Sequence, residues 1–272
     1  AYLEPDRKYG YAYLDATRSA LTFVDDLEKR KLAISIHVFY LDIFEDIVTR
    51  LSCSKENIKV FVTTTLDQKE SVQEILQQNS FDFTIVPLPN HGRDVLPFIK
   101  ILPIVIKEGF NFILKVHTKK SKHRRDGDLW RNDLYDKLLA HDRIEAAFDI
   151  FGSDFSVGII GPEGHIVNME TYWGSNEANV LHLAERLNIE RDLILDVPFI
   201  AGTMFYARVE ALMPILELGL VESEFEIEEG QTDGTLAHVV ERFISIGALQ
   251  NGFKVSSFSG EYENEDNYMY VK

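Results

Sequence analysis

The sequence predicts an α/β fold in which helices flank a mainly parallel central sheet. Short runs of β-branched and apolar residues alternate with longer segments whose apolar residues recur every three or four positions. The connections between these segments are short, and 45% of the 272 residues are hydrophobic, enough for a packed core. Strands and helices that alternate in this way form parallel sheets with helices on both faces.

The alternation is clearest in the first half of the chain. Predicted strands there cover residues 32–39, 58–64, 83–87 and 112–116, and predicted helices cover residues 40–51, 68–78 and 95–108. In the first of these helices, apolar residues recur on one face at Leu41, Phe44, Ile47, Val48 and Leu51. Because each helix lies between two strands, this half predicts successive β-α-β units.

The second half of the chain has longer loops between its elements. Helical patterns follow residues 129–131 as far as residue 151 and recur at 180–187, 208–218 and 234–246. Strands are predicted at 157–162 and 197–206, loops at 172–179 and 222–232, and an exposed or partner-bound tail at 260–272. The chain has no internal repeat or low-complexity linker. We therefore expect one domain over residues 32–272, preceded by a helical appendage of residues 1–31.

Charge and composition exclude several classes of protein. The formal net charge of −16 argues against general nucleic-acid binding and against docking of the bulk surface on anionic lipid. The longest apolar run, residues 95–106, is too short to span a bilayer and contains Pro97, Lys100 and Pro103. A single cysteine, Cys53, excludes an internal disulfide and a cysteine-rich metal site. The signatures GxGxxG, GxxxxGK[ST], HExxH and GxSxG are absent from the sequence.

A concentrated basic segment follows the predicted strand at 112–116. Residues 112–125, FILKVHTKKSKHRR, carry six lysines and arginines and two histidines in an otherwise acidic chain. Like charges packed together repel one another unless an anion balances them, so a phosphate site is one interpretation, and a solvated loop is the other. The candidate phosphate ligands are His117, Lys119, Lys120 and Arg124.

The turn Asn90-His91-Gly92-Arg93-Asp94 follows another predicted strand. Gly92 permits an unusual backbone angle, and Arg93 offers a planar fork of donors for phosphate or carboxylate. A helix-capping turn would look similar, with Asp94 favoured by the helix dipole. Ligands of open α/β sheets bind at the carboxyl ends of the strands, where both this turn and the basic segment are expected.

An acidic segment, residues 226–234, precedes the last predicted helix, in which His238, Glu241 and Arg242 share one face. Exposed ion pairs have the same spacing, so the helical residues indicate little by themselves. A carboxylate in a loop that faces the ligand edge can act as a general base toward a hydroxyl group. The acidic segment is therefore the candidate source of a base.

Five motifs in order resemble the rhamnan synthesis protein F family. They are NHGRD at 90–94, KVHTKKS at 115–121, Trp-Arg at 130–131, GTMFYAR at 202–208 and EEGQTDGTLAHVVER at 228–242. The resemblance implies a GT-A-like glycosyltransferase of bacterial polysaccharide or O-antigen assembly. The implied reaction is inverting transfer of a deoxyhexose, L-rhamnose, from a dTDP-sugar to a hydroxyl of a lipid-linked cell-surface glycan.

The resemblance also implies roles for individual residues. Asp233 is the expected catalytic base, with Glu229 as the second choice. The expected ligands of the donor and its diphosphate are Asn90, Gly92, Arg93, Asp94, His117, Lys119, Lys120 and Arg131. The expected acceptor and sugar side consists of Trp130, which would stack on a saccharide ring, with Gly202, Thr203, Gln231 and His238.

His117-Thr118-Lys119 stands where metal-dependent relatives carry a DxD motif, so the resemblance implies a reaction without a metal or any cofactor besides the donor. The expected partners are the nucleotide-sugar, the lipid-linked acceptor and further glycosyltransferase domains of a longer chain, with no nucleic acid. The expected location is the cytoplasm, at the inner face of the membrane. Two alternatives stay open, a non-catalytic nucleotide- or glycan-binding module and a phosphotransferase acting on sugar phosphates.

Overall fold

A computed structural model describes residues 31–51, 57–120, 126–194 and 197–260. Seven strands in these ranges form one sheet in the order β3-β2-β1-β4-β8-β5-β9. Their bounds are β1 (Leu32–Val38), β2 (Ile58–Thr64), β3 (Phe83–Pro87), β4 (Phe112–His117), β5 (Val157–Gly161), β8 (Phe205–Arg208) and β9 (Lys254–Ser257). Strands β3, β2, β1 and β4 are parallel, β8 is antiparallel to β4 and β5, and β9 is parallel to β5. The predicted mainly parallel sheet is confirmed.

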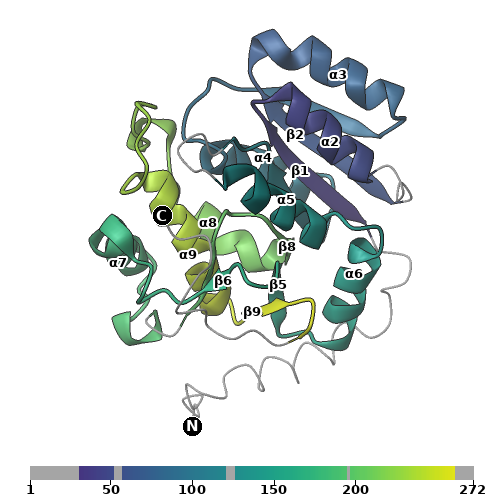
Figure 1. The fold of residues 1–272 in the computed structure, drawn as a ribbon. Helices are drawn as coiled ribbons and strands as arrows, with labels where there is room; N and C mark the ends of the chain where they lie inside the picture. The colour runs from purple at the N-terminus through teal and green to yellow at the C-terminus, as the bar shows by residue number, and fades with distance from the viewer. Residues whose placement is uncertain (1–30, 52–56, 121–125, 195–196, 261–272) are drawn as a thin grey trace.

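Helices cover both faces of the sheet (Figure 1). One face packs against α2 (Leu41–Leu51), α3 (Lys69–Gln78), α5 (Gly127–Leu138) and α6 (Arg143–Ser153). The other face packs against α4 (Val95–Lys107), α7 (Glu177–Arg186), α8 (Met213–Glu217) and α9 (Leu236–Gln250). Alternate residues of one strand enter different cores, since Ala33 lies in the α4 core while Ile34 lies in the α2 core.

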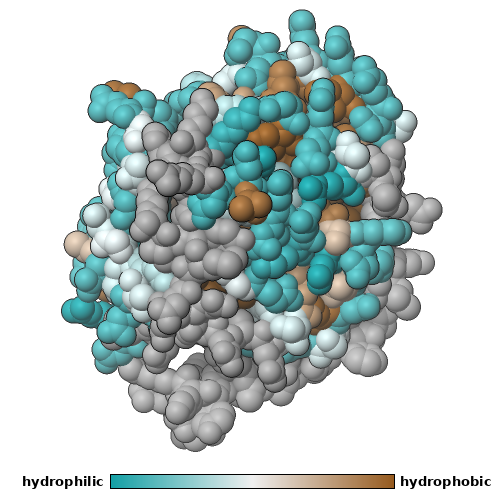
Figure 2. All heavy atoms as spheres, in the orientation of Figure 1, coloured by the Kyte–Doolittle hydropathy of each residue, from teal (hydrophilic) through white to brown (hydrophobic). Residues whose placement is uncertain are grey.

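Short elements complete the described chain. A second sheet pairs β6 (Ile166–Val167) with β7 (Phe199–Ile200) in antiparallel fashion. Single 3₁₀ turns occur at Leu66–Gln68, Gly174–Asn176, Arg191–Leu193, Val209–Leu212 and Glu222–Glu224. The helices of the described ranges include none that is long and apolar enough to cross a membrane. Hydrophilic side chains dominate the face shown in Figure 2, in keeping with the acidic composition.

The predicted elements of the first half match the structure closely, and those at 58–64 and 83–87 match to the residue. The main differences lie in the second half. The helical pattern up to residue 151 is two helices, α5 and α6, because the chain turns after Leu138. The carbonyl of Leu138 accepts a hydrogen bond of 2.8 Å from the Tyr206 hydroxyl, so a contact with a distant strand satisfies the helix end.

The predicted strand at 197–206 is also wrong, because it is two strands, β7 and β8, in different sheets. Between them Gly202 and Thr203 have φ of 94° and 55°, a left-handed turn that no strand accommodates. The sequence patterns also assigned no element to β9 or to the short strand β6. The predicted appendage and tail lie outside the described residues, apart from Lys31 and Gly260.

Gly158 of β5 gives a test of this packing. A Cβ atom there would lie 2.3 Å from Phe253 Cβ and 2.8 Å from Ala211 Cβ. Gly158→Ala should therefore lower the free energy of unfolding by about 1–3 kcal/mol, measured by urea denaturation. Gly152→Ala is the matched control, because no atom lies within 4 Å of its added methyl group and alanine favours the helix. Equal midpoints for the wild type and Gly158→Ala would contradict the described packing of β5.

Candidate functional site

A cleft opens at the carboxyl edge of the parallel strands. It has a volume of about 270 Å³ and is lined by His37, Phe39, Tyr40, Asn90, Arg93, Asp94, His117, Thr118, Lys119, Lys120 and Glu228. Apart from Glu228 of the acidic segment, these residues lie at or just after the carboxyl ends of β1, β3 and β4, because strands that run in one direction end at one edge. The structure thus brings the NHGRD turn and the start of the basic segment together, while Arg124 lies outside the described residues.

Asp94, which lines the cleft, forms an ion pair with the buried Lys115. Lys115 of β4 is 2% exposed, and its Nζ lies 2.5 Å from Asp94 Oδ2 and 2.8 Å from the carbonyl oxygen of Thr203. Burial by itself would raise the pKa of Asp94, but His117, which acts only when its ring is protonated, and the ammonium group of Lys115 outweigh this effect and lower that pKa below its ordinary value. Asp94 is therefore a carboxylate, and Lys115 occupies one of its oxygens.

Two imidazoles lie beside this ion pair. Thr63, His37 and His117 are register partners across β2, β1 and β4. His37 Nδ1 lies 3.0 Å from Thr63 Oγ1, and burial lowers the pKa of His37 to about 4. His117 Nδ1 lies 3.3 Å from Asp94 Oδ2 but without the alignment of a hydrogen bond. Burial lowers the pKa of His117 well below its ordinary value, so both rings are neutral at pH 7.

The two lysines after β4 lie in different surroundings. Lys119 Nζ lies 4.1 Å from the centroid of the Trp130 ring, and burial lowers the pKa of Lys119. Lys120 Nζ instead lies 2.6 Å from Asp42 Oδ2 at the start of α2. Lys119 is thus the inner cation of the cleft and Lys120 the outer one.

Residues of α5 hold the segment that follows β4. The Tyr135 hydroxyl donates to the His117 carbonyl over 2.7 Å, and Arg131 Nη1 donates to the Lys119 carbonyl over 3.2 Å. Thr118 Oγ1 accepts hydrogen bonds from the backbone N–H groups of Phe39 and Tyr40. The backbone at residues 117–119 is therefore fixed from two sides.

The ammonium group of Lys119 lies over the Trp130 ring. The indole is 7% exposed, packs against Gly202 and donates from Nε1 to His165 Nδ1 over 3.3 Å. His165 Nε2 in turn lies 2.6 Å from Asp133 Oδ2. Because one ring nitrogen of His165 accepts from the indole, the other carries the proton that Asp133 binds.

Arg93 ties the NHGRD turn to the acidic segment. Its backbone N–H donates to Glu228 Oε1 over 3.1 Å, and its guanidinium donates to the Gln231 carbonyl and to His238 Nε2. Gly92 precedes it with φ of 64°, and a Cβ atom at Gly92 would lie 2.4 Å from Leu96 Cβ. Glycine is therefore required at the point where the turn enters α4.

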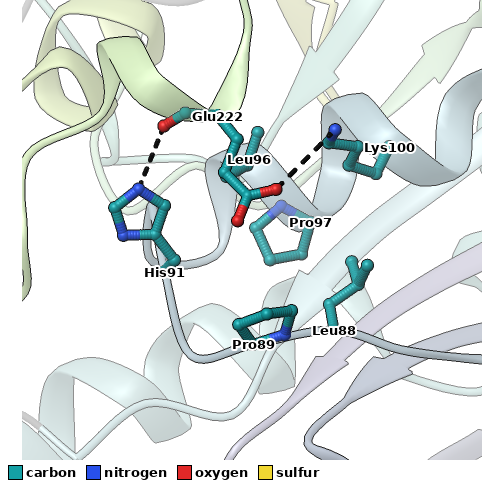
Figure 3. A pocket seen from close by; sticks show the side chains of 7 residues that line it. All are labelled: Leu88, Pro89, His91, Leu96, Pro97, Lys100 and Glu222. Atoms are coloured by element: carbon teal, nitrogen blue, oxygen red, sulfur yellow. Dashed lines mark hydrogen bonds and ion pairs between the residues drawn. The ribbon is translucent and has the colours of Figure 1, made fainter.

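His91 of the same turn makes a second attachment, to Glu222 (Figure 3). His91 Nε2 donates to the Glu222 carbonyl over 3.0 Å, and Lys100 Nζ lies 4.0 Å from Glu222 Oε2. The segment from Glu222 to Gln231 is thus held at two places against the turn and the first part of α4.

The turn at Gly202 and Thr203 reaches the site from β8. Glu241 of α9 accepts hydrogen bonds of 2.8 Å from the Gly202 N–H and from the Thr203 hydroxyl. The Thr203 carbonyl accepts from Lys115. Glu241 therefore links α9 to the buried ion pair.

The carboxylates of the acidic segment lie in different surroundings. Glu228 lines the cleft, whereas Glu229 is exposed. Asp233 accepts hydrogen bonds of 2.9 Å from the Ser175 N–H and 2.7 Å from Asn176 Nδ2. Burial would raise the pKa of Asp233, but these bonds lower it.

The site residues expected from the sequence did not include Lys115, His37, Glu228 or Glu241, although Glu228 lies in the acidic segment and Glu241 on the helix face that the sequence pointed out. Lys115 carried a usable signal, because a lysine inside a buried strand needs a partner for its charge. Glu228 and Glu241 carried only the coarser signals of the acidic segment and of helical spacing, and His37 carried none beyond its residue type. Within the part of the chain that the structure describes, no group of three or more His, Cys, Asp or Glu is arranged to hold a metal ion.

Two solved structures share weak similarity with this chain. One is 4-diphosphocytidyl-2C-methyl-D-erythritol synthase of Anaerococcus prevotii, with 12% identity, a TM-score of 0.43 and coverage of 89% of this chain and 92% of that chain. The other is the apo form of mouse xyloside xylosyltransferase 1, with 10% identity, a TM-score of 0.41 and coverage of 82% and 83%.

Sequence comparisons give a closer relation. Two curated relatives are 35% identical to this chain over 261 residues. Both are called uncharacterized protein WxcX, and they come from two different strains of Xanthomonas campestris pv. campestris. The matched region is 94% of this chain and 37% of each relative, so the chain spans little more than a third of their length. Residues 11–253 match the family described as rhamnan synthesis protein F. These matches confirm the resemblance of the five motifs and show that the chain belongs to the rhamnan synthesis protein F family.

Proposed function

We propose that this chain is a glycosyltransferase domain of bacterial polysaccharide synthesis that binds a nucleotide-sugar in the cleft between the NHGRD turn and the basic segment. The observation that carries the proposal is the arrangement of Lys119, Lys120 and Arg93 around one cleft. Asp94, which is paired with Lys115, lines the same cleft. Membership of a family named for rhamnan synthesis supports L-rhamnose, carried by dTDP, as the sugar.

The proposed chemistry depends on charge at the leaving group. When the bond between sugar and diphosphate breaks, negative charge develops on the diphosphate, and fixed cations that face it stabilise the transition state. Lys119, Lys120 and His117 would face the diphosphate, with Arg93 at the other wall of the cleft. Asp94 would accept hydrogen bonds from hydroxyl groups of the sugar with the oxygen that Lys115 leaves available.

The cations also supply the charge that a divalent ion would otherwise bring. A divalent ion would be repelled by Lys115, whose Nζ already contacts Asp94, and by Lys119. We therefore propose transfer without a metal.

The base of an inverting transfer must reach the acceptor hydroxyl. Among the carboxylates of the acidic segment, we propose Glu228 as the first candidate because it lines the cleft. Asp233, the candidate from the sequence, remains the alternative, although its bonds to Ser175 and Asn176 weaken it as a base. The proposed acceptor is a hydroxyl of a growing lipid-linked glycan, in agreement with the family resemblance.

The remaining predicted residues take supporting roles in this proposal. Trp130 would position Lys119 instead of stacking on a sugar, because its ring is 7% exposed and already faces Lys119 and Gly202. Gln231 and His238 would hold Arg93, and Arg131 would hold the backbone of Lys119. Asn90, at the exposed edge of the cleft, would contact the nucleotide.

The inner and outer lysines should differ in their effect on donor binding. Lys119→Ala should weaken binding of dTDP-L-rhamnose by roughly 10- to 100-fold, because a hydrogen bond to a charged group contributes about 1.5–3 kcal/mol. Lys120→Ala should weaken it by about fivefold or less, because Lys120 is 34% exposed and pairs with Asp42. Isothermal titration calorimetry measures both, with Lys107→Ala at the far end of α4 as the control.

Unchanged donor affinity in the Lys119→Ala, Lys120→Ala double variant would refute the proposed diphosphate site. If the wild type binds dTDP-L-rhamnose but neither transfers nor hydrolyses it across a panel of rhamnose-containing glycans, the chain is a binding module.

Amide variants test which carboxylate of the acidic segment acts as the base. Glu228→Gln keeps a hydrogen-bond acceptor for Arg93 but cannot take a proton, so kcat should fall by roughly 10²- to 10⁴-fold with little change in donor affinity. Asp233→Asn should mainly lower the melting temperature, because it weakens the bonds to Ser175 and Asn176. Glu185→Gln, at an exposed position of α7, is the matched control. Normal transfer by Glu228→Gln, with transfer abolished in Asp233→Asn or Glu229→Gln, would assign the base to the residue changed in that variant.

Chelation tests the absence of a metal from the reaction. Because protein cations provide the charge in this proposal, EDTA should leave the initial rate of transfer from dTDP-L-rhamnose unchanged, and added Mg²⁺ or Mn²⁺ should not raise it. Loss of transfer in EDTA that is restored by a divalent ion would overturn this part of the proposal.

A further inference from the structure

His37 and His117 form a pair of imidazoles, and the proposed transfer assigns no role to their protonation. They are register partners on adjacent strands, and both line the cleft. His117 is 4% exposed, and its Nδ1 has no hydrogen-bond partner among the described residues. A buried polar atom without a partner is costly, so its retention points to a state in which it is used.

The charges that face this pair are few and can be named. Asp94 faces it from the start of α4, Lys115 from β4 itself and Lys119 from the segment after β4. From β2 the nearest polar group is the uncharged Thr63 hydroxyl. With both rings neutral, these three groups sum to one positive charge, part of which the Glu241 carboxylate of α9 offsets at Lys119.

The other charged groups of the cleft already have opposite partners. Arg93 Nε lies 3.7 Å from Glu228 Oε2, and Lys120 Nζ lies 2.6 Å from Asp42 Oδ2. They therefore add little net charge at the imidazole pair.

Without a ligand, the excess positive charge disfavours protonation of either imidazole. A bound diphosphate favours protonation. The diphosphate of a nucleotide-sugar carries two negative charges, more than the excess positive charge of the free cleft can balance. An imidazolium at His117, a side chain that is 4% exposed, would offset the remaining negative charge where an unbalanced charge is costly.

We infer that His117, with His37 beside it, is a proton-coupled subsite for the diphosphate, so that binding of the nucleotide-sugar places a proton on His117. This inference rests on the proposed function. His117 is the carrier because its Nδ1 lacks a partner and lies 3.3 Å from Asp94 Oδ2, whereas His37 Nδ1 already contacts Thr63.

The direction of the pH dependence follows from this assignment. The pKa of His117 is low in the free protein and higher in the complex, so the complex binds more protons. Donor affinity should then increase as pH falls between these two pKa values, by up to about tenfold per pH unit for one proton.

Calorimetry with dTDP-L-rhamnose tests the inference, because both phosphates of this donor are esterified and the ligand itself does not titrate between about pH 5 and 8. Titration in buffers of different ionisation enthalpy yields the number of protons taken up on binding. The wild type should take up between about half a proton and one proton near pH 6.5, and His117→Gln close to none. His182→Gln on the exposed face of α7 is the matched control and should behave like the wild type.

Zero uptake by the wild type, or equal uptake by the wild type and His117→Gln, would overturn the inference. Loss of uptake only in His37→Gln would overturn the choice of His117. Should His117→Gln fail to fold, ring NMR of the wild type replaces it, because one of the eight histidines must move to its imidazolium shift when donor is added.

Sulfate, which has a fixed charge, separates this inference from the proposed function. If dTDP-L-rhamnose does not bind but sulfate binds with uptake that His117→Gln removes, the nucleotide-sugar proposal fails and the subsite stands. Donor binding without proton uptake leaves the proposed function intact and refutes the subsite. Failure of both ligands to bind refutes both.

Discussion

The ion pair between Lys115 and Asp94 is the constraint on which the site depends. An ammonium group in the middle of a buried strand is tolerated only with partners, and here they come from the NHGRD turn and from the turn at Thr203. Removing one member would leave an unpaired buried charge, at a cost of about 3–5 kcal/mol. Three segments that are distant in the sequence are therefore fixed relative to one another before any ligand binds.

Each of these segments then fixes a further part of the cleft. Next to Asp94, Arg93 holds Glu228 and Gln231 of the acidic segment, and next to Thr203, Glu241 links the turn to α9. The result is a local excess of positive charge in a chain whose formal net charge is −16. Because long-range repulsion is screened beyond about 8–10 Å at physiological salt, short-range contacts with the lysines decide whether an anion binds.

Local patterns were sufficient for the parallel half of the sheet, because each strand there is a short apolar run with its own helix. They failed at residues 197–206, where Lys115 and Glu241 bind a left-handed turn at Gly202 and Thr203, since contacts from distant segments leave no periodic signal. The edge that carries the cleft could be predicted from strand direction alone. Which carboxylate of the acidic segment faces the cleft could not, because a loop has no period that fixes side-chain direction.

The orientation of Trp130 shows how far the site depends on such distant contacts. A tryptophan beside a basic segment favours a stacking surface when only the sequence is known, but the ring is directed inward by His165, which Asp133 holds in one tautomer. The indole then presents its face to Lys119 at 4.1 Å, and this contact favours the charged form of a lysine whose burial opposes it. The same ring fills the space beside Gly202, so the inner cation and the left-handed turn share one support. The position of the Lys119 ammonium group in this cleft is thus set by side chains that need not contact a ligand themselves.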